Sequence, residues 1–343
     1  MKVLISGGAG YIGSSIASYC LDSGITPVLL DSLVTGRREF TEGRIFYEGD
    51  IADGALIDRI YAEHPDIHAV VHCAALIVVP ESVADPVGYY RANVAKTLEF
   101  LSHLLRNGCE RLVFSSSASV YRAGEDFAVD ESSPIDPHSP YARSKAICED
   151  MLRDVAASTP LRVLSLRYFN PLGADPLLRT GAQFPRTRQV IGALIAAHET
   201  GEPFQVAGGA FATRDGSAVR DYLHVWDLAA AHVAALREFD RVVTDRVGST
   251  VVNLGTGAGT TVFELVKAFG EVVGSPLHVV VGPPRPGDAA GAFTRTDRAE
   301  RLLGWRTRKS LAEALSDALA WAEVWPRSET VPPIGASTVR HPG

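Results

Sequence analysis

Short apolar runs alternate with amphipathic stretches from the first residue to about residue 168. Each run has the length of a strand, ends at turn residues and is followed by a stretch with helical periodicity. A strand that is apolar throughout must be covered on both faces, so this alternation predicts a parallel sheet with helices on either side. The predicted strands are 3–6, 27–31, 45–48, 68–74, 111–115 and 161–167, and the predicted helices are 11–23, 54–63, 86–107 and 140–157.

The regular alternation fades after residue 168, where glycines and prolines become frequent. We expect a long loop over 170–182, an irregular segment over 208–221, strands over 251–254 and 278–281, and helices over 188–199, 225–238, 262–273 and 311–324. The chain as a whole therefore predicts an α/β fold, a doubly wound parallel sheet with a smaller, interleaved C-terminal substrate lobe. The expected boundaries are 1–169 for the first domain, 170–325 for the lobe and 326–343 for a loose tail.

Composition and charge exclude several classes of protein. The formal charge of −7 argues against a nucleic-acid partner, which requires a basic surface. The four cysteines lie far apart without a CxxC pair, which argues against a metal site and favours a reducing compartment. No apolar run reaches the roughly 18 residues of a membrane span. We expect a soluble cytoplasmic protein with no metal and no membrane partner.

Three glycines, Gly7, Gly10 and Gly13, follow the first predicted strand at the spacing G-x-x-G-x-x-G. Glycines let the backbone approach a diphosphate, and the start of the next helix supplies free N–H groups and a positive dipole. Asp31 ends the second predicted strand 18 residues after Gly13, where an acid holds the adenosine ribose hydroxyls. A carboxylate about 4 Å from a 2′-phosphate would repel it by roughly 1–4 kcal/mol. The pattern predicts a Rossmann-type domain that binds NAD in preference to NADP.

Tyr141 and Lys145 stand four residues apart at the start of a predicted helix, which places both on one helix face. A phenol acts as a base near neutral pH only if its pKa falls by about 3 units, or roughly 4 kcal/mol. A lysine ammonium and an oxidised nicotinamide ring, both cationic, would supply such a field. Ser117 closes a run of three serines at the carboxyl end of a predicted strand, where open α/β sheets bind ligands.

These motifs, with others, resemble the extended short-chain dehydrogenase/reductase family, and within it the UDP-glucose 4-epimerase branch of the NAD-dependent epimerases and dehydratases. The resemblance extends from residue 1 to about residue 324. The stretches that carry it are Gly7-Gly-Ala-Gly-Tyr-Ile-Gly13, Gly49-Asp50-Ile51, 115–119 with Val120-Tyr121, 141–145, Arg167-Tyr-Phe-Asn-Pro171 and Arg220-Asp-Tyr-Leu-His-Val225.

The resemblance implies an isomerase of carbohydrate metabolism that epimerises a UDP-hexose at C4 by transient oxidation with bound NAD. The sugar would be glucose or galactose, with the N-acetyl sugars as a further possibility. The resemblance also implies a homodimer formed through the helices over 86–107 and 140–157. It assigns catalysis to Ser117, Tyr141 and Lys145. Further NAD contacts would come from Tyr11, Ile12, Asp50, Ile51, Asn93 and Tyr168, and substrate contacts from Asn170, Arg220, Arg285, Asp288 and Ala292.

The sequence departs from the family pattern at four places. Ile77 stands where a lysine near the NAD diphosphate is usual, and Arg122 replaces a glycine. Arg186-Thr187 replaces a pair of asparagines. Ala292 stands where the family often has a tyrosine beside the C2 substituent of the sugar, so the N-acetyl sugars become candidate substrates.

Three alternative functions have different requirements. A nucleotide-sugar dehydratase needs an Asp-Glu pair just after the strand-end residue, but here the stretch is Ser117-Ala118-Ser119. A UDP-glucuronate 4-epimerase must bind a carboxylate, and Arg179, Arg186 and Arg188 lie in a suitable region. A non-catalytic NAD(H) sensor needs neither the tyrosine nor the lysine. The sequence leaves the glucuronate and sensor alternatives open.

Overall fold

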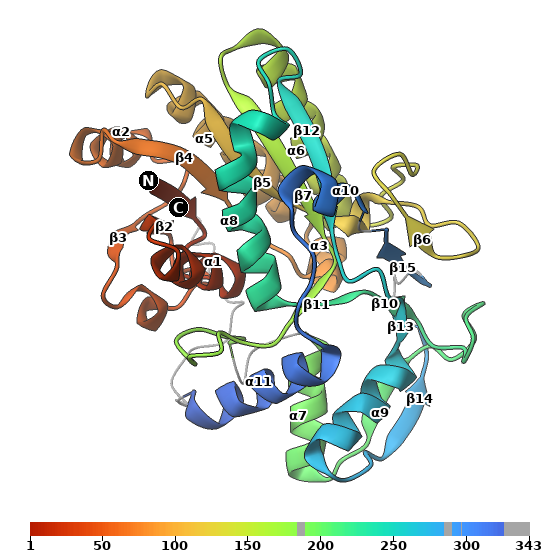
Figure 1. Ribbon diagram of the computed structural model, residues 1–343. Helices are drawn as coiled ribbons and strands as arrows, with labels where there is room; N and C mark the ends of the chain where they lie inside the picture. The colour runs from red at the N-terminus through yellow and green to blue at the C-terminus, as the bar shows by residue number, and fades with distance from the viewer. Residues whose placement is uncertain (184–188, 285–289, 296, 326–343) are drawn as a thin grey trace, which may run out of the picture.

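The computed structural model describes residues 1–183, 189–284, 290–295 and 297–325. Its centre is a seven-stranded, fully parallel sheet in the order β12-β7-β5-β4-β1-β2-β3 (Figure 1). The order runs outward from β1 in both directions, so the predicted doubly wound α/β fold is confirmed. The strands are β1 (Lys2–Ser6), β2 (Thr26–Asp31), β3 (Ile45–Glu48), β4 (Ile67–His72), β5 (Arg111–Ser117), β7 (Arg162–Tyr168) and β12 (Ser249–Leu254).

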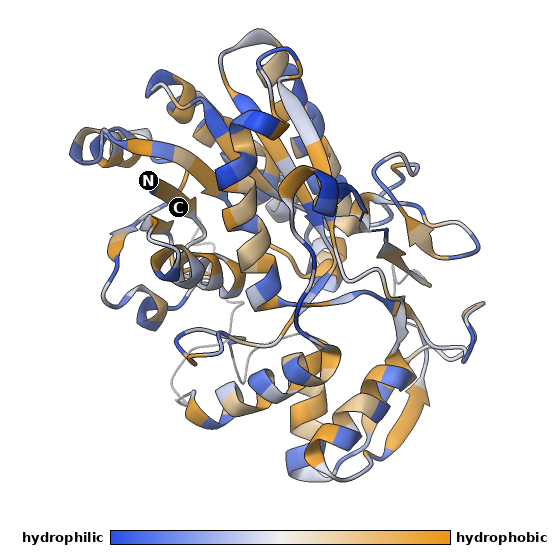
Figure 2. Ribbon diagram, viewed as in Figure 1, coloured by the Kyte–Doolittle hydropathy of each residue, from blue (hydrophilic) through white to orange (hydrophobic). Residues whose placement is uncertain are grey.

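Both faces of this sheet are buried, as the largely apolar strands in the middle of Figure 2 indicate. Val3 and Ile5 of β1 pack against helices α1, α8 and α10, whereas Leu4 packs on the opposite face against α2, α5 and α6. This alternation follows from the two-residue period of a strand. The six helices are α1 (Tyr11–Asp22), α2 (Gly54–Glu63), α5 (Lys96–Arg106), α6 (Pro140–Ser158), α8 (Val225–Val242) and α10 (Asp297–Leu303).

The prediction of one helix over 86–107 is wrong in one respect, because this segment is not a continuous α-helix. A π-helical turn containing Asn93 separates its two α-helical parts, and a further helix precedes them that we did not predict. A π-helical turn holds more residues than an α-helical turn, so it shifts the two parts relative to each other. The segments are α3 (Val79–Ala84), α4 (Pro86–Tyr90) and the π-helical η2 (Arg91–Ala95), followed by α5.

Much of the chain after residue 170 packs around a second core, which lies below the main sheet in Figure 1. The segments predicted as a loop over 170–182 and as irregular over 208–221 contain short strands. The sequence did not predict them, because strands of two or three residues leave no periodic signal. The remaining elements of the described structure are β6 (Ala128–Val129), β8 (Asn170–Leu172), α7 (Val190–Thr200), β9 (Phe204–Ala207), β10 (Val219–Arg220), β11 (Tyr222–His224), β13 (Thr260–Thr261), α9 (Val262–Val273), β14 (Val279–Gly282), β15 (Gly291–Thr294), α11 (Leu311–Val324), and the 3₁₀ turns η1 (Arg38–Thr41) and η3 (Ala118–Val120).

The chain passes between these two parts more than once. α8, β12 and α10 follow residue 170 in sequence but complete the main sheet and one of its covering layers. In return, Phe40 of η1 packs against Trp321 and Trp325, with ring centroids 5.9 and 5.0 Å away. No helix in the described ranges is long and apolar enough to cross a membrane. The tail predicted over 326–343 lies outside these ranges.

Candidate active site

The turn between β1 and α1 is too tight to accept side chains on its glycines. Gly7 has a φ of +73°, and a Cβ atom there would lie 2.7 Å from the backbone nitrogen of Ala74. A Cβ atom on Gly13 would lie 2.2 Å from the carbonyl oxygen of Gly7. Gly10 caps α1 without a side chain, so the first N–H groups of the helix are open to an anion.

The carboxylate of Asp31 lies beside this turn at the end of β2. It accepts hydrogen bonds from the backbone N–H groups of Ala9, at 3.0 Å, and Leu33, at 2.8 Å. Burial raises the pKa of Asp31, and the two hydrogen bonds act in the opposite direction. A Cβ atom on Gly36 would lie 2.6 Å from one of its oxygens. An open helix N-terminus next to a fixed carboxylate fits the diphosphate and the ribose diol of NAD.

Four other residues predicted to contact NAD differ in their surroundings. Tyr11 donates its hydroxyl hydrogen bond to the carbonyl of Gly173, at 2.7 Å. Ile12 packs at the margin of one core, and Ile51 is buried in the core on the other face of the sheet. Tyr168 ends β7, and its burial raises the pKa of its hydroxyl well above the ordinary value. Tyr11 therefore also joins the first helix to the segment after β8.

Asp50 and Asn93 already have partners within the protein. Asp50 forms an ion pair with Lys96. The Asn93 side chain accepts from the backbone N–H of Leu76 at 2.8 Å and donates to its carbonyl at 2.9 Å and to the hydroxyl of Ser144 at 3.0 Å. Asn93 thus holds the loop after β4 against α6, on which Ser144 lies between the predicted catalytic tyrosine and lysine.

The first turn of α6 is fixed by its sequence. Pro140 occupies the first helical position, where its missing N–H costs nothing. The hydroxyl of Ser139 accepts the N–H of Ala142 at 3.1 Å and so caps the helix. As a result, Tyr141 and Lys145 project from consecutive turns of one face, and both are buried.

Ser117, Tyr141 and Lys145 come together where α6 lies on the carboxyl end of β5. The Lys145 ammonium donates to the carbonyl of Ser115 at 2.9 Å and lies 4.9 Å from the ring centroid of Phe114. Tyr141 is within hydrogen-bonding reach of Ser117. The three side chains predicted to catalyse the reaction therefore all lie at the last three residues of β5.

The electrostatics of this cluster favour uncharged side chains. Burial raises the pKa of Tyr141, and the hydrogen bond with Ser117 only partly opposes this effect. Burial lowers the pKa of Lys145, while Glu149 is among the groups that raise it. The protein alone therefore keeps Tyr141 protonated, so its ionisation requires another positive charge in the site.

A buried hydrogen-bond network that the sequence did not predict holds Ser115, the residue whose carbonyl accepts from Lys145. The hydroxyl of Ser115 lies 3.2 Å from Nε2 of His232 on α8 and 3.1 Å from the sulfur of Cys73. Burial lowers the pKa of His232 to about 4, so its ring is neutral. His232 lies 117 residues from Ser115 in the sequence, and no local spacing could have paired them.

Two residues predicted to bind substrate lie side by side on neighbouring strands. Arg220 of β10 and Ala292 of β15 are partners in the parallel ladder. Ala292 packs against a small cluster that includes Ala118, the residue after Ser117. Arg285 and Asp288 lie outside the described residues.

Asp221 acts as an anchor for the strands on this side of the site. Its carboxylate accepts the N–H and the hydroxyl of Thr256, at 2.8 and 2.6 Å, and the N–H groups of Gly257 and Thr294, at 3.2 and 3.3 Å. Its carbonyl accepts the N–H of Asn170 at 2.9 Å. Asp221 thus joins β8, the loop after β12 and β15.

Residues 3–255 match the NAD dependent epimerase/dehydratase family, and this span includes the glycine turn, the main sheet and the catalytic cluster. The chain belongs to this family. A UDP-glucose 4-epimerase of Azospirillum brasilense is 41% identical over 323 residues, which cover 93% of this chain and 91% of that protein.

Solved structures of similar proteins carry related names. A UDP-glucose 4-epimerase of Stenotrophomonas maltophila, with bound NAD and formylated UDP-arabinopyranose, is 36% identical with a TM-score of 0.87 and covers 94% of this chain and 98% of its own. That of Bifidobacterium longum, in complex with NAD⁺ and UDP, is 33% identical with a TM-score of 0.87 and the same coverage. The UDP-Glc/GlcNAc 4-epimerase of Campylobacter jejuni is 32% identical with a TM-score of 0.78 and covers 94% and 99%.

Two of the positions at which this member departs from the family pattern lie on the surface. Ile77 is 52% exposed. Arg122 is exposed and pairs with Asp136 at 3.4 Å. Arg186-Thr187 lies outside the described residues.

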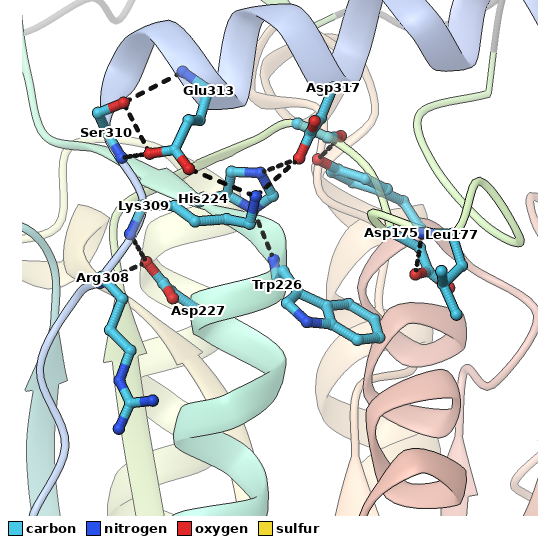
Figure 3. A network of polar contacts seen from close by, with 12 residues as sticks. Asp175, Leu177, His224, Trp226, Asp227, Arg308, Lys309, Ser310, Glu313 and Asp317 are labelled. Atoms are coloured by element: carbon cyan, nitrogen blue, oxygen red, sulfur yellow. Dashed lines mark hydrogen bonds and ion pairs between the residues drawn. The ribbon is translucent and has the colours of Figure 1, made fainter.

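His224 connects the substrate side of this family member to its last described helix (Figure 3). Its Nδ1 accepts the N–H of Trp226 at 3.0 Å, so its Nε2 carries the proton and donates to Asp317 of α11 at 3.0 Å. A Cβ atom on Gly173 would lie 2.9 Å from this imidazole. Because the Gly173 carbonyl accepts the hydroxyl of Tyr11, this contact joins α11 to the first turn of α1.

We predict that Gly13→Ala weakens NAD binding about 5- to 150-fold, which corresponds to the 1–3 kcal/mol typical of overpacking. The added methyl cannot fit against the Gly7 carbonyl. Titration with NADH, followed by nucleotide fluorescence, measures the change. Gly124→Ala is the control, because the nearest atom to its Cβ would be 3.6 Å away. An unchanged affinity in Gly13→Ala would show that the turn does not form the cofactor site.

Proposed function

We propose that this protein is an NAD-dependent UDP-hexose 4-epimerase that interconverts UDP-glucose and UDP-galactose. The observation that carries the proposal is the meeting of Ser117, Tyr141 and Lys145 at the end of β5. The open N-terminus of α1 beside Asp31 supports NAD as the cofactor. The names of the similar proteins support a UDP-sugar substrate.

The catalytic residues have separate tasks. Bound NAD supplies the acceptor, and later the donor, of the hydride at C4. Tyr141 takes the proton of the 4-hydroxyl as the ketone forms and returns a proton when C4 is reduced on its other face. Ser117 hydrogen-bonds the reacting oxygen, and Lys145 holds the nicotinamide ribose and contributes positive charge.

Burial of Tyr141 makes this charge necessary. Burial raises the pKa of Tyr141, so a phenolate is disfavoured by the protein's own groups. Cations next to a phenol favour its ionised form. The Lys145 ammonium and the cationic ring of oxidised nicotinamide would together supply the charge. Tyr141 would therefore remove the proton only while oxidised NAD is bound, which is also the state in which C4 can lose its hydride.

Inversion at C4 requires the keto sugar to present both faces in turn. The sugar must therefore be held loosely while the nucleotide is held firmly. We assign the diphosphate to Arg220 and Arg285, with Asn170 near the phosphates and Asp288 on the uridine ribose. The anchoring of Asn170 and β15 by Asp221 supports a rigid clamp on this side.

The two alternative functions, a UDP-glucuronate 4-epimerase and an NAD(H) sensor, have weaker support. A UDP-glucuronate 4-epimerase needs a free cation for the carboxylate, but Arg179 is paired with Asp22 and Asp175. Arg186 and Arg188 lie outside the described residues. The convergence of three reactive side chains is not required of an NAD(H) sensor.

We predict that purified protein supplied separately with UDP-glucose and UDP-galactose brings both to one equilibrium mixture. Tyr141→Phe should lower kcat at least about 100-fold, because it removes the acid–base group, while NAD and UDP still bind. Tyr19→Phe, remote from the cluster on α1 and packed against Trp226, should keep wild-type turnover. Wild-type turnover in Tyr141→Phe would contradict the mechanism, and binding without turnover in wild type would favour the sensor.

We predict that the protein also accepts UDP-N-acetylglucosamine, because Ala292 leaves space beside the sugar. Ala292→Tyr should reduce kcat/KM for the N-acetyl sugar about 5- to 150-fold, the equivalent of 1–3 kcal/mol of crowding. The value for UDP-glucose should change by less than about threefold, which makes it the internal control. The prediction fails if wild type ignores the N-acetyl sugar, or if the ratio of the two values is unchanged.

We propose a homodimer formed through 86–107 and 140–157 as a four-helix bundle. Each of the helices in these segments has an exposed apolar side chain that an interface would cover, since Val87 of α4, Leu98 of α5 and Ile147 of α6 are 64%, 47% and 38% exposed. Sedimentation equilibrium should give twice the 36.7 kDa of one chain. Leu98→Glu combined with Ile147→Glu should give the single-chain mass, and a monomeric wild type at micromolar concentration would exclude this interface.

A further inference from the structure

A buried ion pair fastens α6 to the main sheet beyond the catalytic residues. Glu149 of α6 and Arg167 of β7 each have 8% of the side chain exposed. Nε of Arg167 lies 2.9 and 3.1 Å from the two oxygens of Glu149, and its Nη2 donates to the second oxygen as well. The hydroxyl of Ser116 donates to the first oxygen. The carboxylate is thus held by two residues from neighbouring strands.

The arginine is itself fixed on its far side. Its Nη1 donates to the hydroxyl of Tyr121 at 2.7 Å, and its guanidinium stacks 4.8 Å from the centroid of the Tyr121 ring. Tyr121 in turn donates to Asn253 of β12 at 2.7 Å. Ser116, Arg167 and Asn253 are partners in the parallel ladders of β5, β7 and β12. A polar row therefore crosses three strands beneath α6.

Glu149 belongs to the same helix stripe as the catalytic pair. Tyr141, Lys145 and Glu149 are spaced by four residues, so all three face the sheet. Lys145 binds the carbonyl of Ser115, Glu149 binds the hydroxyl of Ser116, and Tyr141 reaches Ser117. Three consecutive residues of β5 thus register three turns of α6.

A buried ion pair is a poor device for stability alone. Two charges lose their hydration on burial, and well-packed apolar residues of similar size often stabilise a protein as much or more. What the pair offers is direction, because two charged groups with several hydrogen bonds accept one geometry. An apolar contact at the same place would let α6 slide or rotate over β5.

We propose that Glu149 and Arg167 are positioning residues that set the rotation and height of α6 on β5, and so hold Tyr141 and Lys145 in the geometry needed for proton and hydride transfer. The proposal rests on the proposed function. Glu149 lies about 12 Å along the helix from Tyr141, and the partners of the pair are Ser116 and Tyr121, which are not among the residues assigned to substrate or cofactor. Loss of the pair should therefore affect the chemical step and leave nucleotide binding intact.

The test compares wild type with Glu149→Met/Arg167→Met, which removes both charges without leaving one of them buried alone. The double variant should keep its NAD content, its affinity for UDP and its KM within about twofold, while kcat falls about 100-fold, the effect of a misplacement of about 1 Å. Glu149→Asp keeps the charge on a shorter side chain, so its kcat should lie about tenfold above that of the double variant and about tenfold below that of wild type. If the double variant does not fold, Glu149→Asp alone should still lower kcat with unchanged KM.

Arg162→Met is the matched control, because Arg162 begins the same strand and pairs with Asp240 of α8 at 2.7 Å. It should keep kcat within about twofold. Wild-type kcat in the double variant, or in Glu149→Asp if the double variant does not fold, would overturn the positioning role. A wild type without epimerase activity would refute the proposed function instead. In that case a crystal structure of whichever variant folds still decides the inference, since an unchanged distance of 2.9 Å between Nζ of Lys145 and the carbonyl of Ser115 would contradict it.

Discussion

The contact between α6 and the carboxyl end of β5 is the interaction on which the site depends. Burial removes water from the Lys145 ammonium, and a hydrogen bond to the carbonyl of Ser115 and a cation–π contact with Phe114 replace it. This exchange places an ammonium within the protein, next to the end of a strand where parallel sheets bind ligands. Tyr141, one turn earlier on the same face of α6, lies next to Ser117. Because burial disfavours the charge on both side chains, ionisation of Tyr141 needs a further positive charge nearby.

The site also depends on a second set of contacts, which join the strands predicted to bind substrate, β8 and β15, to the end of the main sheet. The carboxylate of Asp221 binds backbone N–H groups of β15 and of the loop after β12, and its carbonyl accepts the N–H of Asn170 in β8, so one residue aligns segments from both parts of the chain. Tyr11, next to the glycine turn, donates to Gly173 after β8, and His224 at the end of β11 donates to Asp317 of α11. Asn170 of β8 and Thr294 of β15 are thereby held by hydrogen bonds that do not involve the sugar. Such an arrangement suits a reaction in which only the sugar must move.

The features that the sequence predicted are those written in local spacing. The main sheet follows from apolar runs, the tight turn after β1 from Gly7, Gly10 and Gly13, and the shared helix face of Tyr141 and Lys145 from a four-residue interval. The features it missed depend on contacts between distant residues. Glu149 meets Arg167 18 residues later, Asp221 meets Thr294 73 residues later, and His232 meets Ser115 across 117 residues. The π-helical turn at Asn93 was hidden because apolar periodicity continues through it.

The central claim is that one site removes the hydride from C4 and returns it to the same carbon. UDP-galactose labelled with deuterium at C4, incubated in ordinary water without added NAD, tests it directly. The account predicts UDP-glucose that retains deuterium at C4, because the hydride never leaves the site and only the Tyr141 proton exchanges with solvent. Loss of the label to water during conversion would contradict the account, because it would mean that C4 inverts by proton removal or by release of the reduced cofactor.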